Sequence, residues 1–181
     1  EKAKSILQQE GYCQGTQLEV PLTFRSNVPA DKLLALTWQA QVQRDLSDCM
    51  VLKLDGVEST TVYRQLGEGS FKAVILDWLG SYPDPEAYLN PLLSCSNAQG
   101  HVCLDGEAAI SGSFWRAPGL QKALQQSDSL RGTPRMEVLN TIEKLTVDGA
   151  AYIPVWLESP RSWSQRSLNP PEYDRSGFLR L

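Results

Sequence analysis

Short apolar runs alternate with helix-length amphipathic segments through the first half of this chain, and this alternation constrains the fold. The candidate strands are Leu18–Phe24, Met50–Leu54 and Val74–Leu76. The helices expected around them are Lys2–Glu10, Pro29–Leu46 and a segment that Ser59 or Thr60 caps and that runs to about Leu66. Strands that alternate with helices predict an α/β fold with a mostly parallel sheet and helices on both faces.

The second half of the chain is expected to be mainly helical. The expected helices are Glu86–Leu93, Pro118–Gln126 and Arg135–Val147, a long loop spans Ser94–Gly112, and a last strand is Ala151–Trp156. The segment from residue 159 to residue 181 is rich in proline, serine and arginine and has weak periodicity. Pro21 further suggests that the first strand lies at a sheet edge or is irregular, because proline cannot donate to a strand ladder.

The segment Phe71–Pro85 (FKAVILDWLGSYPDP) is the candidate functional edge of the chain. A short buried strand runs directly into Asp77 and Trp78 and then into a turn rich in glycine and proline. Ligands of α/β proteins bind at the carboxyl ends of the strands, and aromatic walls suit small organic ligands and peptides. On composition alone, Trp78 is better explained as a core residue.

Composition and charge restrict the partners. The 181 residues have a formal net charge of -4 and contain no cluster of lysine and arginine, which argues against a nucleic-acid partner. No apolar run approaches the roughly 20 residues that span a bilayer. The chain opens without a signal peptide, which we attribute to trimming or to removal of an N-terminal region.

Four cysteines allow three pairings. Cys95 and Cys103 flank a polar loop that a disulfide would close, and Cys13 and Cys49 each precede a predicted strand, so their positions can be neighbours in a βαβ unit. The expected disulfides are therefore Cys13–Cys49 and Cys95–Cys103, which favour a location outside the cytoplasm. Four free thiols remain the alternative.

Catalytic and metal sites find little support. The single histidine, His101, lies in the long loop without a G-x-S-x-G motif, so a Ser-His-Asp site is disfavoured. A zinc site built on Cys95, His101, Cys103, Asp105 and Glu107 lacks a CxxC knuckle, and a disulfide explains its cysteines more simply. Neither a phosphate-binding loop nor any other cofactor motif is found. Asp84 and Glu86 fit turn formation and helix capping better than acid/base chemistry.

The chain resembles one family along nearly its whole length. Lys2–Tyr12 (KAKSILQQEGY) is similar to the opening of the second lobe of the peptide/nickel-type extracytoplasmic solute-binding proteins of ABC importers, known as family 5. Phe71–Trp78 resembles the family's G-x-F-D-x-x-x-x-x-W strand, and Tyr82–Leu89 (YPDPEAYL) its Y-P-D-P-x-x-F-L continuation. Ala150–Trp156 (AAYIPVW) resembles its A-P-Y-I-P-L strand. The ordered set is more specific than any single motif.

The resemblance implies a periplasmic-binding-protein-like C-terminal lobe over residues 1–158, followed by an irregular tail over 159–181 that returns toward a missing N-terminal lobe. Such a lobe captures a peptide or another small solute by hinge closure and delivers it to ABC permease subunits. It implies a periplasmic or extracytoplasmic location, with membrane attachment only through an anchor, such as that of a lipoprotein, outside these residues. Neither a catalytic role nor a cofactor or metal is implied.

The ligand-binding residues that follow are Asp77, Trp78, Leu79, Gly80, Ser81 and Tyr82. Ser81 departs from the family, whose peptide-binding members carry an aspartate there that meets the ligand's amine. A buried ammonium needs a charged partner, so we expect a ligand other than a conventional free-amine peptide, or an amine met by the missing lobe. The alternatives are an extracytoplasmic enzyme that uses Asp77 or Asp84, and a protein-interaction module.

Overall fold

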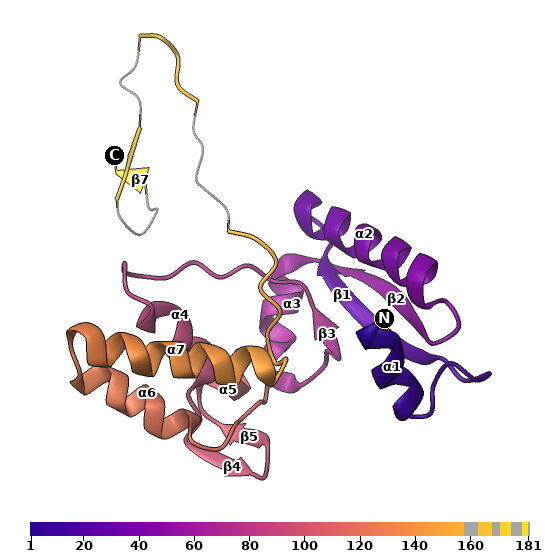
Figure 1. Ribbon diagram of the computed structural model, residues 1–181. Helices are drawn as coiled ribbons and strands as arrows, with labels where there is room; N and C mark the ends of the chain where they lie inside the picture. Colours follow the sequence, from indigo (N-terminus) through magenta and orange to yellow (C-terminus); the bar gives the residue numbers. More distant parts are fainter. Residues whose placement is uncertain (158–162, 168–170, 175–178, 181) are drawn as a thin grey trace. The chain divides into compact units, whose positions relative to one another are not determined.

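A computed structural model describes residues 1–157, 163–167, 171–174 and 179–180 (Figure 1). The chain forms two compact units, Glu1–Asp77 and Trp78–Leu181. The boundary at residue 158 between the expected lobe and its tail lies outside the described residues, so this division stays a prediction. Within the expected tail, β6 (Glu172–Tyr173) pairs antiparallel with β7 (Leu179–Arg180).

The first unit contains a parallel three-stranded sheet with helices, as the alternating pattern predicts. Its elements are α1 (Lys2–Gln9), β1 (Leu18–Arg25), α2 (Pro29–Leu46), β2 (Met50–Val57), α3 (Ser59–Gln65), the 3-10 helix η1 (Leu66–Glu68) and β3 (Ala73–Val74). The strand order is β2-β1-β3, and β1 runs parallel to both neighbours. The α/β fold class is therefore confirmed.

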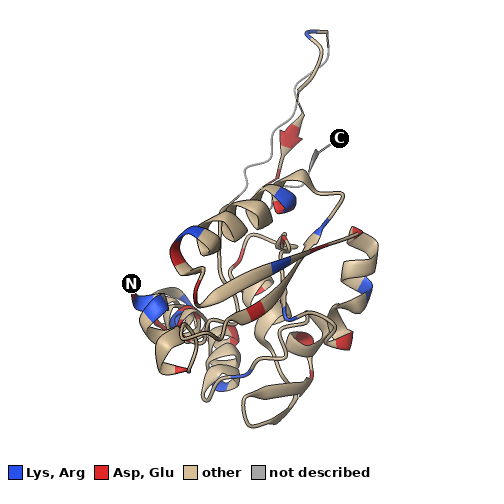
Figure 2. Cartoon of the chain, turned by 90° about the vertical axis from the view of Figure 1, so that its right-hand side faces the viewer, with Lys and Arg blue, Asp and Glu red and all other residues tan. Residues whose placement is uncertain are grey.

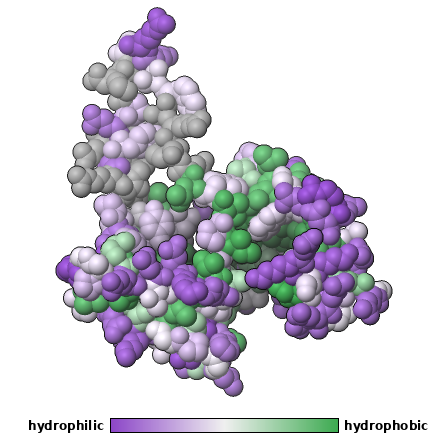
Figure 3. Space-filling view, viewed as in Figure 1, coloured by the Kyte–Doolittle hydropathy of each residue, from purple (hydrophilic) through white to green (hydrophobic). Residues whose placement is uncertain are grey.

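Packing of α2 against β1 and β2 forms the core of the first unit (Figure 1). Proline at the first helical position and Asp31 in the first turn favour the start of α2, where both were expected. Leu22 of β1, Leu52 of β2 and Ile75, which directly follows β3, pack with Ala35 of α2, and all four are buried. The N-terminal half of α2 also carries exposed Leu33 and Leu36, where Figure 3 shows hydrophobic side chains on the surface.

Three details of the first unit differ from the sequence expectations. Pro21 lies in the central strand, not at an edge, because β3 pairs only with Leu22 and Thr23 and leaves Pro21 outside the doubly paired part. The third strand is only two residues long, so most of the expected Val74–Leu76 strand follows β3 as extended chain. The side chain that caps α3 belongs to Glu58 rather than to Ser59 or Thr60.

The second unit is mainly helical. Its first elements are α4 (Glu86–Leu93), β4 (Asn97–Gln99), β5 (Val102–Asp105), α5 (Glu107–Ile110), α6 (Leu120–Ser129) and α7 (Gly132–Asp148). Leu93 of α4, Leu120 and Leu124 of α6, and Ile142 of α7 meet in one buried apolar cluster. The amphipathic helices thus bury their apolar faces against one another.

Two expectations for this unit are wrong. The expected loop Ser94–Gly112 contains a β4–β5 hairpin and the short helix α5, because a disulfide and backbone pairing organise its polar sequence. The expected strand Ala151–Trp156 forms no strand. Its periodicity is that of a strand, but Ile153 and Val155 lie exposed, and no described strand pairs with it.

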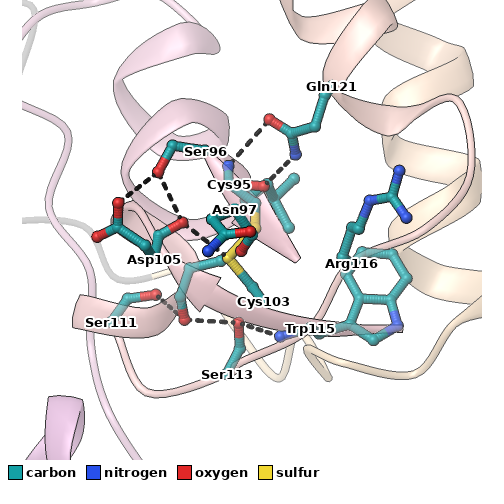
Figure 4. The surroundings of a disulfide bond; sticks show 12 residues. Cys95, Ser96, Asn97, Cys103, Asp105, Ser111, Ser113, Trp115, Arg116 and Gln121 are labelled. Atoms are coloured by element: carbon teal, nitrogen blue, oxygen red, sulfur yellow. Dashed lines mark hydrogen bonds between the residues drawn. A yellow bond between two sulfur atoms is a disulfide. The ribbon is translucent and has the colours of Figure 1, made fainter. Parts of the chain in front are cut away.

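Both expected disulfides are present. Cys13 and Cys49 are joined because β1 and β2 are parallel neighbours whose starts lie side by side, and the Leu18 amide donates to the Cys49 carbonyl at 2.8 Å. Cys95 and Cys103 close the β4–β5 hairpin (Figure 4). The Gln121 amide fixes this hairpin to α6, since it accepts from the Cys95 amide and donates to the Leu93 carbonyl, each at 2.9 Å.

Charged positions of both signs are interspersed along the chain (Figure 2). Among the described residues, no helix has the length and hydrophobicity that a membrane crossing requires.

The two disulfides should differ in their effect on stability because they close loops of different length. Their cysteines are separated by 36 and 8 residues. Replacing Cys13 and Cys49 together by alanine should lower the free energy of unfolding by roughly 4 kcal/mol, against roughly 2.5 kcal/mol for Cys95 and Cys103. Urea unfolding of the two double variants measures this, and an equal or reversed order would contradict it.

Candidate functional site

The carboxyl edge of the parallel sheet is a topological switch point. From β1 the chain passes through α2 to β2 on one side, and from β2 it returns through α3 to β3 on the other side. Arg25 is the last residue of β1, and Asp77 follows β3 by three positions. In open α/β sheets, ligands bind where the strand order reverses in this way.

Arg25 is buried at this edge and forms a two-pronged ion pair with Asp31 of α2. Its Nε donates to Oδ2 of Asp31 at 2.7 Å, and its Nη2 donates to Oδ1 at 3.1 Å. The two side chains are only 6% and 4% exposed. The pair therefore holds the end of β1 against the first turn of α2, because separating the two charges would leave each of them buried without a partner, at a high cost in free energy.

Asp77 joins the same network from the end of the third strand. The remaining arm of Arg25, Nη1, donates to Oδ1 of Asp77 and, at 2.8 Å, to the hydroxyl of Tyr63 on α3. The Tyr63 hydroxyl in turn donates to Oδ1 of Asp77 at 2.7 Å. Unlike Arg25 and Asp31, the side chain of Asp77 is 68% exposed, so this carboxylate presents the network to solvent.

The protonation states follow from these contacts. Partial burial works against ionisation of Asp77, but the hydrogen bonds from Tyr63 and Arg25 outweigh it and hold its pKa below the ordinary value. Burial, and then the hydrogen bond to Asp77, raise the pKa of Tyr63, so its hydroxyl keeps the proton that it donates. The hydrogen bond to Asp31 contributes most to raising the pKa of Arg25.

In the second unit, Trp78 is anchored by one end and open at its surface. Its indole Nε1 donates to the carbonyl of Ala87 in the first turn of α4 at 3.0 Å, while the residue is 45% exposed. Leu79, Ser81 and Tyr82 are also exposed. Trp78 is therefore not a core residue, which removes the alternative that composition favoured.

Gly80 is buried beneath the ring of Tyr88. A Cβ at this position would lie 2.6 Å and 2.8 Å from two ring atoms of Tyr88, well inside van der Waals contact. The sequence WLGSY thus needs glycine so that the segment can lie against α4. This close approach fixes the path of the residues on either side of Gly80.

Asp84 has a structural role, as its turn sequence predicts. It forms a two-pronged ion pair with Arg135 of α7, with distances of 2.9 Å and 2.7 Å, and accepts a hydrogen bond from the backbone amide of Glu86 at the start of α4. Arg135 also donates to the carbonyl of Ser127 in α6. A shallow, charged pocket of ≈ 330 Å³ lies beside this pair, lined by Tyr82, Asp84, Glu86, Asp128, Arg131 and Arg135.

The residues considered as zinc ligands do not form a metal site in the described part of the chain. Cys95 and Cys103 are bonded to each other, so no thiolate is available for zinc. Asp105 instead accepts a hydrogen bond from Ser96 within the hairpin (Figure 4). Within the part of the chain that the structure describes, no group of three histidine, cysteine, aspartate or glutamate side chains is placed to hold a metal ion.

The structure thus divides the expected ligand-binding residues between its units. Asp77 ends the first unit, and Trp78, Leu79, Gly80, Ser81 and Tyr82 open the second. Sequence reasoning missed Arg25, Asp31, Tyr63 and Arg135. Arg25 carries a usable signal, since a charge at the end of an alternating apolar strand calls for a buried partner. The partner itself is not marked in the sequence.

Comparison with solved structures places the fold. The chain matches the murein tripeptide binding protein MppA of Escherichia coli with a TM-score of 0.68 and 22% identity, over 83% of this chain and 27% of that one. It matches Haemophilus influenzae OppA in complex with the peptide RPPGFSPFR with a TM-score of 0.67 and 16% identity, over 80% and 26%. NikA of Brucella suis in complex with Fe(III)-EDTA gives 0.61 and 18%, over 83% and 30%.

These matches confirm the resemblance to peptide/nickel-type solute-binding proteins at the level of the fold. The chain has a periplasmic-binding-protein-like fold and spans about a quarter of the length of the solved structures that it matches. No protein-family model matches the chain, and neither does any curated protein sequence.

Replacing Gly80 by alanine should destabilise the second unit. The added methyl group meets the ring of Tyr88, and overpacking of this kind costs about 1 to 3 kcal/mol. Thermal unfolding measures the loss. Combining Gly80→Ala with Tyr88→Ala should restore part of it, relative to Tyr88→Ala alone. Full additivity of the two losses would contradict the contact.

The Asp84–Arg135 pair should give a pH-dependent contribution to stability. Arg135, and then the Glu86 amide, hold the pKa of Asp84 below its ordinary value of 3.8, so the contribution is complete above that value and disappears as pH falls through the lowered pKa. Asp84→Asn should cost roughly 1 to 2 kcal/mol at pH 7. Urea unfolding at several pH values should show the wild type and Asp84→Asn converging only below about pH 4. A constant difference down to pH 2 would contradict the pair's role.

Proposed function

We propose that this chain is one lobe of the substrate-binding component of an ABC importer, and that it captures peptides or related small solutes by hinge closure. The similarity of its fold to MppA, OppA and NikA carries this proposal, because solute-binding proteins share this fold across different solutes. MppA is a murein tripeptide binding protein, and the OppA and NikA structures hold a nine-residue peptide and an iron chelate. A peptide or a compact polar solute is the class that they have in common.

The proposed ligand-binding residues are Asp77, Trp78, Leu79, Gly80, Ser81 and Tyr82. The exposed Trp78 supports this assignment, because its indole nitrogen is already bonded to Ala87 and its free surface can pack against a ligand. Gly80 supports it by fixing the course of the segment against Tyr88. Ser81 and Tyr82 add exposed hydroxyl groups beside this aromatic surface.

The proposed role is ligand binding without catalysis. The carboxylates that an enzyme would use, Asp77 and Asp84, are each bound by an arginine. Tyr63 and Arg25 lower the pKa of Asp77, and Arg135 lowers the pKa of Asp84. A lowered pKa makes a carboxylate a weak base and leaves it without a proton to donate near neutral pH. This favours binding over acid/base chemistry, in line with the transport proteins that share the fold.

The proposal includes the setting of the lobe. The two disulfides agree with an extracytoplasmic or periplasmic location, where such bonds persist. Residues 1–158 would form the C-terminal lobe, and residues 159–181 would return toward the N-terminal lobe. The full-length protein would then present its closed, ligand-bound form to the permease subunits.

Ligand binding should depend on Trp78. Calorimetry of the full-length polypeptide with a di- to pentapeptide library should detect binding, and Trp78→Ala should weaken it by about tenfold or more because an aromatic wall is lost. Trp163→Ala is the matched control, since Trp163 is 87% exposed and should leave affinity unchanged. Failure of every peptide to bind the wild type would overturn the proposed ligand class.

A further inference from the structure

We propose that the Asp77 carboxylate is the anchor for a positively charged ammonium group of the ligand, held in place by Arg25, Asp31 and Tyr63. This inference rests on the proposed function and names the chemistry that its ligand must carry. It assigns Asp77 as the residue that determines specificity for charge. Arg25 and Tyr63 are positioning residues, because they act on the ligand only through Asp77.

The network has a net negative charge, which favours a cationic ligand group over an anionic one. One guanidinium faces two carboxylates, so the group formed by Arg25, Asp31 and Asp77 carries one net negative charge. Asp31 accepts from both the Nε and the Nη2 of Arg25 and is buried with it, while Asp77 accepts from the Nη1. The net negative charge of the three groups is therefore open to solvent only at Asp77, which is 68% exposed.

The geometry of Asp77 leaves part of its carboxylate for a ligand. The bonds from Arg25 and from Tyr63 both end on Oδ1, so Oδ2 takes part in neither. Two donors on one oxygen fix the plane of the carboxylate before a ligand arrives. An anchor that is oriented in advance binds with less loss of side-chain freedom.

Arg25 itself cannot serve an anionic ligand. Its Nε, Nη1 and Nη2 all donate to protein oxygens, and the residue is 5% exposed. A carboxylate or phosphate that approached this edge would meet the negative charge of Asp77 first. The network therefore selects against anions as well as for cations.

The neutral Ser81 does not exclude a ligand with a free ammonium group if Asp77 supplies the negative charge. The resemblance led us to expect either a ligand other than a conventional free-amine peptide or an amine met by the missing lobe. Asp77 supplies a fixed negative charge four positions earlier, at a switch point of the sheet where ligands bind. A ligand with a free ammonium group is therefore the expected class, with its charge met by Asp77 rather than by residue 81.

Calorimetry on the full-length polypeptide tests this anchor. The tightest binder from the peptide library is compared with its N-acetylated form and with an acetylated form that carries one lysine. Acetylation should weaken wild-type binding by about 30-fold or more, since a charge pair loses one partner. Recovery of affinity with the lysine peptide would place the ammonium on a side chain, whereas no recovery would place it at the N-terminus.

Asp77→Asn provides the decisive variant. It should bind the free-amine peptide about 30-fold more weakly and should no longer distinguish it from the acetylated form. Asp55→Asn is the control, because Asp55 is an exposed carboxylate on β2 of the same sheet and its loss should change affinity less than twofold. Tyr63→Phe, which keeps the ring, should weaken only the free-amine peptide, by about three- to tenfold.

The outcomes separate the two proposals. If peptides bind but acetylation has no effect, or if Asp77→Asn behaves like Asp55→Asn, the ammonium anchor is wrong and the solute-binding function stands. If no peptide binds the wild type, the proposed ligand class fails and the anchor fails with it. Thermal unfolding of Asp77→Asn should stay near that of the wild type, because the side chain lies mostly in solvent.

Discussion

The buried ion pair between Arg25 and Asp31 is the interaction on which the edge of the sheet depends. Both side chains are almost fully removed from water, so each requires the other, and the end of β1 is thereby fixed to the start of α2. The Nη1 of Arg25 then orients Asp77, which follows β3 by three positions. The buried guanidinium of Arg25 thus connects the end of β1 to α2 and to the segment after β3. The exposed end of this network is the Asp77 carboxylate.

In the second unit, an ion pair between an arginine and an aspartate fixes the turn before α4. Arg135 donates two hydrogen bonds to Asp84, and Asp84 also accepts one from the backbone amide of Glu86, the first residue of α4. The segment that begins at Trp78 therefore ends in a turn fixed by a charge pair, with Gly80 packed against Tyr88. In each unit, an arginine and an aspartate far apart in sequence hold in place the residues that we propose to contact the ligand.

Local sequence signals predicted the elements that depend on local energetics. The bounds of α2 and α4 are those expected, because Pro29 suits the first turn of a helix and acidic residues in the first turns of both favour helix starts. The disulfides followed from the parallel pairing of β1 and β2 and from the closure of a polar loop. The strand expected at Ala151–Trp156 failed, since alternation marks a strand only where another strand is available to pair with it.

The pattern of strands, helices and turns was enough to predict the α/β class and the structural role of Asp84, and the family resemblance indicated the candidate segment from Asp77 to Tyr82. The exposure of Trp78 and the network around Asp77 became visible only in the folded chain. The reason is separation along the chain: Arg25 and Asp77 are 52 positions apart, and Asp84 and Arg135 are 51 apart. Periodicity reports which residues share a face, but it does not report which charges meet once the strands are side by side.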